Sequence, residues 1–432
     1  MLDNSNYLER TPHALSHLSF PIGKIGRLQT LSWTPVLPGD GFELDLVGAL
    51  RLSPLRRAMA LDCVIDICSF YVPYRHVYGD DWVNFIEQGN DETVNLPVEA
   101  QPNDVTVNCL GVNNLSSSLP KWMPEGYRQI WNHYYRPVTQ VTETTKPVTD
   151  WSYEAQSHGL RCAQLKSIWS ATLKNRIDPS DYNVGSNTDS GSGAQISLLD
   201  IEKQLGHLRT EQEREYFNTR YRDIVSSFGG STNYSADDRP ELIYRSTFWA
   251  SGFDINGTDQ TSLGQFSGRV VQPFRHRVPR KFIPEHGTVW TLCLVRFPPL
   301  CPFENHYLVN HPNPSYAELA GDPEIVGTQP PHKLIQSDVF DTNSNSAIGY
   351  VPFGQHYRYQ PPIISKFYEK LKGFPFLDGI PGASTESHLV HADRYDAMFQ
   401  TTQLGHWQVH AKANVTAHRR LPSARTSLVT GA

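Results

Sequence analysis

Charged residues, methionine and long apolar runs are all scarce in this chain of 432 residues. Asp, Glu, Lys and Arg make up 19% of it, below the quarter that is usual for soluble domains, and there are only 4 methionines. No window approaches the roughly 18 consecutive apolar residues that a membrane-spanning helix needs, and the first residues provide neither the basic start nor the apolar stretch of a signal peptide. We therefore expect the chain to be made and used in a cytosol.

Cysteine is equally scarce, and no two cysteines form a CxxC pair. The 6 cysteines are Cys63, Cys68, Cys109, Cys162, Cys293 and Cys301. In so long a chain this scatter favours reduced thiols over a disulfide framework.

The short motifs of common enzyme classes are absent as well. The sequence has no HExxH, no GxSxG, no GxxxxGKS/T and no complete GxGxxG. Adjacent acids, such as Asp80 with Asp81 and Asp237 with Asp238, stand near turn residues without an apolar stretch around them, so we interpret them as solvated surface acids. These absences argue against catalysis, and they indicate no cofactor and no metal site.

Turn-forming and aromatic residues are what the chain has in quantity, with 31 prolines, 30 glycines and 11% aromatics. This composition favours a β-rich fold with long loops. Segments that alternate in polarity or are apolar throughout predict strands at residues 28–33, 42–51, 63–71, 241–249, 270–282, 289–297 and 406–418. Strands from both ends of the chain predict one β-domain, interrupted by insertions at about residues 90–240 and 300–390.

Side chains alternate between the two faces of a strand, so Cys63 and Cys68 are expected to point in opposite directions. Helical spacing of apolar residues predicts a long helix from Ser197 to the glycines at 229–230 and a shorter one at 80–88. Stretches rich in Pro, Ser, Asn, Thr and Gly predict loops at 90–132, 173–193 and 305–350.

Two pairs of histidines could suggest metal ligands. His13 and His17 follow Thr11-Pro12, which is typical of a helix start, so they are predicted to share one helical face. His406 and His410 share a strand face but would lie about 13 Å apart at a rise of roughly 3.3 Å per residue, too far to bind one ion. Solvated or interface histidines are therefore favoured at both places.

The net charge of -6, from 38 basic and 44 acidic residues, argues against a simple nucleic-acid binder. Basic residues nevertheless gather in three short clusters: Arg51, Arg56 and Arg57; Arg275, His276, Arg277, Arg280 and Lys281; and His418, Arg419, Arg420 and Arg425. Phe274 and Phe282 bracket the second cluster, a mixture that can bind single-stranded nucleic acid by phosphate pairing and base stacking. Salt bridges at subunit contacts are the alternative, and the sequence leaves both interpretations open.

Several long runs of the sequence point to one family. They are PHALSHL (12–18), IGRL (25–28), VGALRLSPLRR (47–57), FYVPYRHVYG (70–79), IVSSFGG (224–230), GTDQTSLGQFSGR (257–269), PEHGT (284–288) and LVRFPP (294–299). In order, and over nearly the whole chain, these runs resemble the major capsid protein of the microviruses, the isometric single-stranded DNA bacteriophages of the phi-X type. The resemblance is weakest at 90–120, 173–193 and 305–350, and Thr426 stands where the family pattern has an acid, which puts any cation site there in doubt.

This resemblance implies a non-catalytic coat protein: an eight-stranded antiparallel jelly roll that forms pentamers and then an icosahedral shell of sixty copies around circular single-stranded DNA. It implies as partners a spike protein, a small basic DNA-packaging protein, internal and external scaffolding proteins and the genome, with assembly in the bacterial host cytoplasm. An acidic shell cannot by itself neutralise a genome, so a separate polycation is needed. We expect the basic residues Arg56, Arg57, Arg275, Arg277, Arg280 and Lys281 to face the DNA or the packaging protein.

Two alternatives from other classes remain at this point. A β-sandwich hydrolase with two distant carboxylates predicts a deep pocket and a stable small oligomer. A carbohydrate-binding jelly roll is compatible with a coat protein, since a phage shell can contact sugar on the host surface.

Overall fold

A computed structural model describes residues 10–55, 62–88, 95–99, 109–112, 118–136, 239–256, 266–297, 306–311, 313–329, 332–335, 347–351, 353–361, 363, 395–396, 398–400 and 405–419. The predicted helix at 197–228 and the predicted loop at 173–193 lie outside these residues. Among the described residues, no helix is both long enough and apolar enough to cross a membrane.

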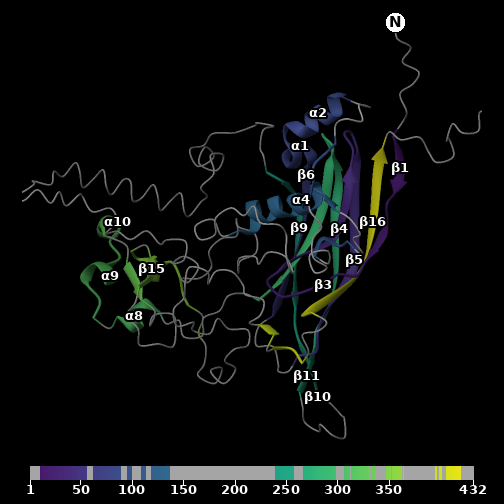
Figure 1. Ribbon diagram of the computed structural model, residues 1–432. Coiled ribbons are helices and arrows are strands. Elements are labelled where there is room, and N and C mark those ends of the chain that lie inside the picture. The colour runs from purple at the N-terminus through teal and green to yellow at the C-terminus, as the bar shows by residue number, and fades with distance from the viewer. Residues whose placement is uncertain are drawn as a thin grey trace, which may run out of the picture.

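Two antiparallel sheets form the body of the molecule (Figure 1). Sheet A consists of β5 (Gly41–Leu52), β12 (Val271–Phe282), β16 (Trp407–Arg419) and the short strands β1 (Thr11–Ala14), β2 (His17–Ser19) and β3 (Ile22–Gly23). Sheet B consists of β4 (Leu28–Val36), β13 (Gly287–Arg296), β6 (Cys63–Pro73) and β9 (Glu241–Ala250), in that order. All seven predicted strands are confirmed, with boundaries that differ by a few residues.

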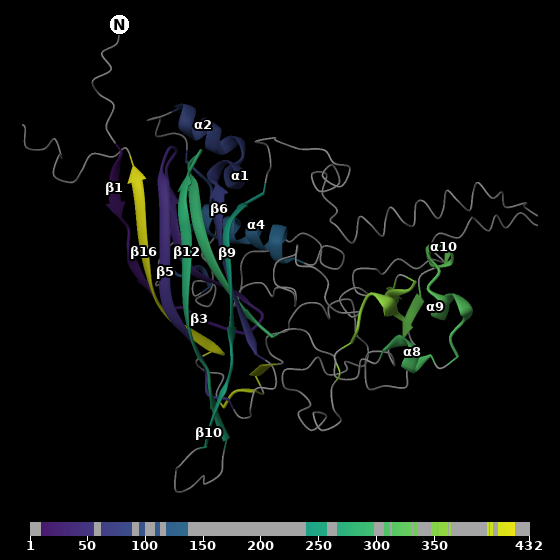
Figure 2. The ribbon, with the colours of Figure 1, turned by 180° about the vertical axis from the view of Figure 1, so that it is seen from behind.

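The last strand of the chain lies in the middle of sheet A. β16 pairs along one edge with β5 and along the other with β3, β2 and β1 in turn, so the three short strands act as one interrupted strand (Figure 2). The indole of Trp407 is fully buried and lies where a Cβ on Gly23 would be, only 2.3 Å from the ring. Glycine is therefore required at this close approach.

The prediction of a helix around His13 and His17 is wrong. The backbone there pairs with β16, and an edge strand tolerates Pro12 because a proline on the solvent side needs no ladder hydrogen bond. The two histidines bind within the chain instead: His13 contacts the Thr11 hydroxyl at 3.0 Å, and His17 contacts the Ser32 hydroxyl at 3.0 Å. Strand pairing with the edge of β16 therefore outweighs the local sequence pattern that is typical of a helix start.

Three strands of sheet B, β4, β6 and β13, are buried on both faces. One face meets sheet A in the sandwich core, and the other packs under α1 (Tyr74–Tyr78), α4 (Trp122–Ile130) and the π-helix at Trp131–Tyr135. Cys63 lies in the first core and Cys68 in the second, as the alternation of β6 predicts. The four described cysteines, Cys63, Cys68, Cys109 and Cys293, are all buried, and none of these four forms a disulfide bond.

Helices and hairpins also occur where the sequence predicts loops. The helix α2 (Asp80–Gln88) is confirmed, but α4 falls inside the predicted loop 90–132, beside the short pair β7 (Val98–Glu99) and β8 (Leu119–Pro120). The predicted loop 305–350 contains α8 (Tyr307–Asn310), α9 (Tyr316–Ala320), α10 (Pro323–Thr328), β14 (His332–Ile335) and β15 (Ala347–Val351), followed by a 3-10 helix at Gln355–Tyr357. The remaining hairpin, β10 (Phe253–Asn256) with β11 (Phe266–Arg269), follows β9. These elements are short, so their apolar periodicity is too brief to detect in a proline-rich background.

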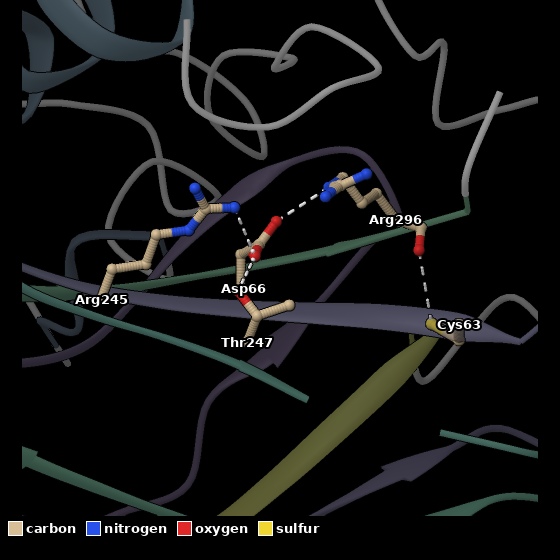
Figure 3. A network of polar contacts seen from close by, with 5 residues as sticks. All are labelled: Cys63, Asp66, Arg245, Thr247 and Arg296. Carbon is tan, nitrogen blue, oxygen red and sulfur yellow. Dashed lines mark hydrogen bonds and ion pairs between the residues drawn. The ribbon is translucent and has the colours of Figure 1, made fainter. Parts of the chain in front are cut away.

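A buried carboxylate joins three strands of sheet B on the face away from sheet A (Figure 3). Asp66 of β6 accepts hydrogen bonds from Arg245 (3.1 Å) and Thr247 (2.7 Å) of β9 and from Arg296 (2.8 Å) of β13. Burial alone raises the pKa of this carboxyl, but the arginines and the threonine hydroxyl together hold it below its usual range. Asp66 therefore stays ionised in the folded chain, with its charge fully paired.

Replacing Asp66 with Asn should destabilise the fold by about 3 kcal/mol, because Arg245 and Arg296 then lose the buried negative charge with which both are paired. Urea unfolding followed by circular dichroism measures this. The matched control is Asp45→Asn, whose carboxylate also binds an arginine but lies near the surface of sheet A. An equal loss of stability in the two variants would contradict the account.

Candidate nucleic-acid interface

The strand β12 separates the residues of the second basic cluster onto two faces. Arg275 and Arg277 point outward from sheet A, whereas the residues that alternate with them, Phe274, His276 and Val278, are buried in the sandwich. Base stacking on Phe274 is therefore excluded, and the prediction of a phenylalanine bracket is wrong at that position. Phe282 is exposed, but Arg10 lies over its ring at 5.7 Å.

The two outward arginines are already paired with acids of the neighbouring strand β5. Arg275 donates two hydrogen bonds to Asp45, at 2.9 and 2.8 Å, and Arg277 lies 3.6 Å from Glu43. The hydrogen bonds from Arg275 hold the pKa of Asp45 below its usual range despite some burial. Together, the two arginines and the two acids therefore carry a net charge close to zero on this face of sheet A.

The remaining predicted contact residues have different surroundings. Lys281 is paired with Glu241, and Arg280 is exposed with its guanidinium beside Gly41. Arg56 and Arg57 lie outside the described residues. In the third cluster, Arg419 is bound to the buried Asp40 at 2.8 Å and is structural.

Other cations lie on the outer face of sheet A, where they are less engaged. Arg51 of β5 and Lys412 of β16 are exposed, and His410 lies between Lys412 and Gln408 on the same strand face. His410 contacts the exposed Phe20 ring edge-on, at 5.4 Å between ring centroids. Alternation at 406–418 indicated that His410 and Lys412 share a face, but strand pairing with 18–22 and 47–51 is what joins them to Phe20 and Arg51.

His276 is the polar centre of the sandwich. Its Nε2 contacts the Ser69 hydroxyl of β6 and its Nδ1 the Ser246 hydroxyl of β9, both at 2.9 Å, and Ser69 also bonds to Thr291 of β13. Burial lowers the pKa of His276 to about 4. A neutral imidazole therefore links sheet A to three strands of sheet B.

His406 is also buried, so the prediction of a solvated or interface histidine is wrong there. Its Nδ1 accepts a hydrogen bond from the backbone N–H of Ile25 at 3.1 Å, and its Nε2 donates to Asp396 at 2.5 Å. In the part of the chain that the structure describes, no group of three or more His, Cys, Asp or Glu side chains is arranged to bind a metal ion. Burial raises the pKa of the Cys63 and Cys68 thiols to about 12, which keeps both in the unreactive protonated form.

The fold and this surface define an antiparallel β-sandwich protein whose charged groups cover an exposed sheet face. A family model described as "Capsid protein (F protein)" matches residues 4–188 and 174–429. The chain is 43% identical to capsid protein F of Escherichia phage G4 over 429 residues, with 98% of each chain covered. It is 44% identical to capsid protein F of Enterobacteria phage phiK and of Escherichia phage alpha3, again with 98% of each chain covered.

The chain belongs to the capsid protein F family of the microviruses, as its sequence runs predict. Membership gives it a structural role in the capsid of a bacteriophage, where copies of the chain assemble with one another.

Acid should weaken the folded chain through His276. Its pKa is about 4 when folded and near 6.5 when unfolded, so the unfolded chain binds more protons between these values. The contribution of the neutral His276 side chain to the free energy of unfolding is fully present above pH 6.5. It falls by about 3 kcal/mol as the pH drops towards 4.

Thermal unfolding of the wild type and of His276→Gln across this range measures the effect. The variant should be less stable at pH 7 and should lose less stability on acidification. Parallel pH curves would contradict the assignment.

Proposed function

We propose that this chain is the major capsid protein of its virus, forming pentamers and then a sixty-copy icosahedral shell around circular single-stranded DNA. The observation that carries the proposal is the family match over nearly the whole chain. Shell building needs broad surfaces and no reaction chemistry, which fits a non-catalytic role. On this proposal, assembly takes place in the host cytoplasm.

The strand order supports a jelly roll as the building block. If β1, β2 and β3 are taken as one strand, the eight long strands in chain order are arranged 1-8-3-6 in sheet A and 2-7-4-5 in sheet B. This is the pattern of two interlocked Greek keys in one sandwich. We infer a single jelly-roll domain over residues 1–432, with insertions at about 90–240 and 300–390 after β6 and after β13.

The proposed partners follow from the shell. They are further copies of the chain, a spike protein, internal and external scaffolding proteins, a small basic packaging protein and the genome, with host-surface carbohydrate as an outer contact. The chain's net charge of -6 supports the need for a separate polycation inside the shell. Under this proposal the exposed face of sheet A, which carries Arg275, Arg277 and Arg280, points towards the interior of the shell, and so do Arg56, Arg57 and Lys281, which is paired with Glu241 of sheet B.

Sedimentation velocity of the expressed chain tests the proposal. The chain alone should sediment as a pentamer, and with the scaffolding proteins it should form much larger closed particles. A monomer under both conditions would contradict the proposal, and a monomer that hydrolyses a sugar substrate would favour the enzyme alternative. Glycan-array screening of whole particles separately tests the carbohydrate contact.

A further inference from the structure

The outer face of sheet A exposes large apolar side chains next to one another. Leu18 is 64% exposed, Phe20 60%, Val271 48%, Val47 44% and Ile22 38%. Strand register aligns them in rows: Leu18, Lys412, Val47 and Arg275 form one row, and Ile22, Gln408, Arg51 and Val271 form another. Exposed apolar groups that adjoin in this way indicate a binding surface.

The charges on this face divide into two groups. Asp45 and Glu43 are engaged by Arg275 and Arg277, so those four side chains neutralise one another. Arg51 and Lys412 are exposed, and neither has an ion-pair partner among the described residues. The part of the face around Phe20 is therefore apolar, aromatic and positively charged.

This combination selects the class of ligand. Proteins that bind single strands without sequence preference combine cations for the phosphates with aromatic rings on which bases stack. A basic peptide is disfavoured here, because the acids that could bind it are already paired with arginines. The surface therefore complements a negatively charged polymer whose bases are exposed.

We propose that Phe20, Arg51, His410 and Lys412 form a binding surface for single-stranded nucleic acid on the outer face of sheet A. Phosphates bind Arg51 and Lys412, and one base stacks on the Phe20 ring, which His410 supports edge-on. The inference rests on the proposed function and deepens it: it moves the DNA contact from Arg275 and Arg277, which are neutralised, to residues that lie one to three strands away from β12 in sheet A.

Fluorescence anisotropy of a short labelled oligothymidylate with the full-length chain, across a salt series, tests this surface. Arg51→Gln with Lys412→Gln should lower the slope of log affinity against log salt by about 1.4, since each phosphate contact on a single strand contributes about 0.7. Phe20→Ala should weaken binding at least about fivefold with little change in slope.

Two controls separate this surface from general charge. Asp45→Asn with Arg275→Gln removes a neutral pair on the same face, and Arg358→Gln removes an exposed charge elsewhere in the chain. Both should bind nearly as tightly as the wild type. An unchanged slope in the Arg51/Lys412 variant would overturn the proposal, and so would tighter binding of a polyarginine peptide than of the oligonucleotide to the wild type.

Sedimentation velocity of the same samples distinguishes a failure of the shell proposal from a failure of the binding-surface proposal. If the wild type fails to form pentamers but the variants show the expected binding pattern, the shell proposal fails and the binding surface stands. If pentamers form and the variants bind like the wild type, only the binding surface fails.

Discussion

The pairing of β16 with β5 is the contact on which the rest of the structure depends. It joins twelve residue pairs between 407–418 and 41–52. The opposite edge of β16 binds β1, β2 and β3. Without β16, sheet A would separate into an N-terminal fragment and a two-stranded remnant, and Trp407 would leave the core. Because this contact is so remote in sequence, its loop-closure cost must be offset by core burial, and we expect it to form late in folding.

Polar groups inside the sandwich give this arrangement its register. His406 fixes the start of β16 against Ile25, His276 links the two sheets, and Asp66 holds three strands of sheet B together. Each is fully hydrogen-bonded, so its burial is tolerated only in the correct alignment of strands. A shell subunit needs this kind of rigidity, since its contacts with neighbours are geometric.

The strands could be predicted from sequence because alternation and β-propensity act within each segment, as at 63–71 and 406–418. The helix predicted around His13 was wrong because its alternative partner, β16, is some four hundred residues away. The pairing of Arg275 with Asp45 could not be predicted for the same reason, because the two residues are far apart in sequence. The second basic cluster is therefore basic in sequence, but its outward arginines are neutralised in the folded chain. Lys412 and Phe20 are the converse case, since only strand register brings them together.

We propose that the exposed face of sheet A points towards the genome in the assembled capsid. A reconstruction of the assembled particle tests this most directly. We predict that Phe20, Arg51 and Lys412 line the inner surface of the shell, with nucleic-acid density against them. A particle in which this face and the Arg275–Lys281 stretch both lie on the outer surface would contradict it.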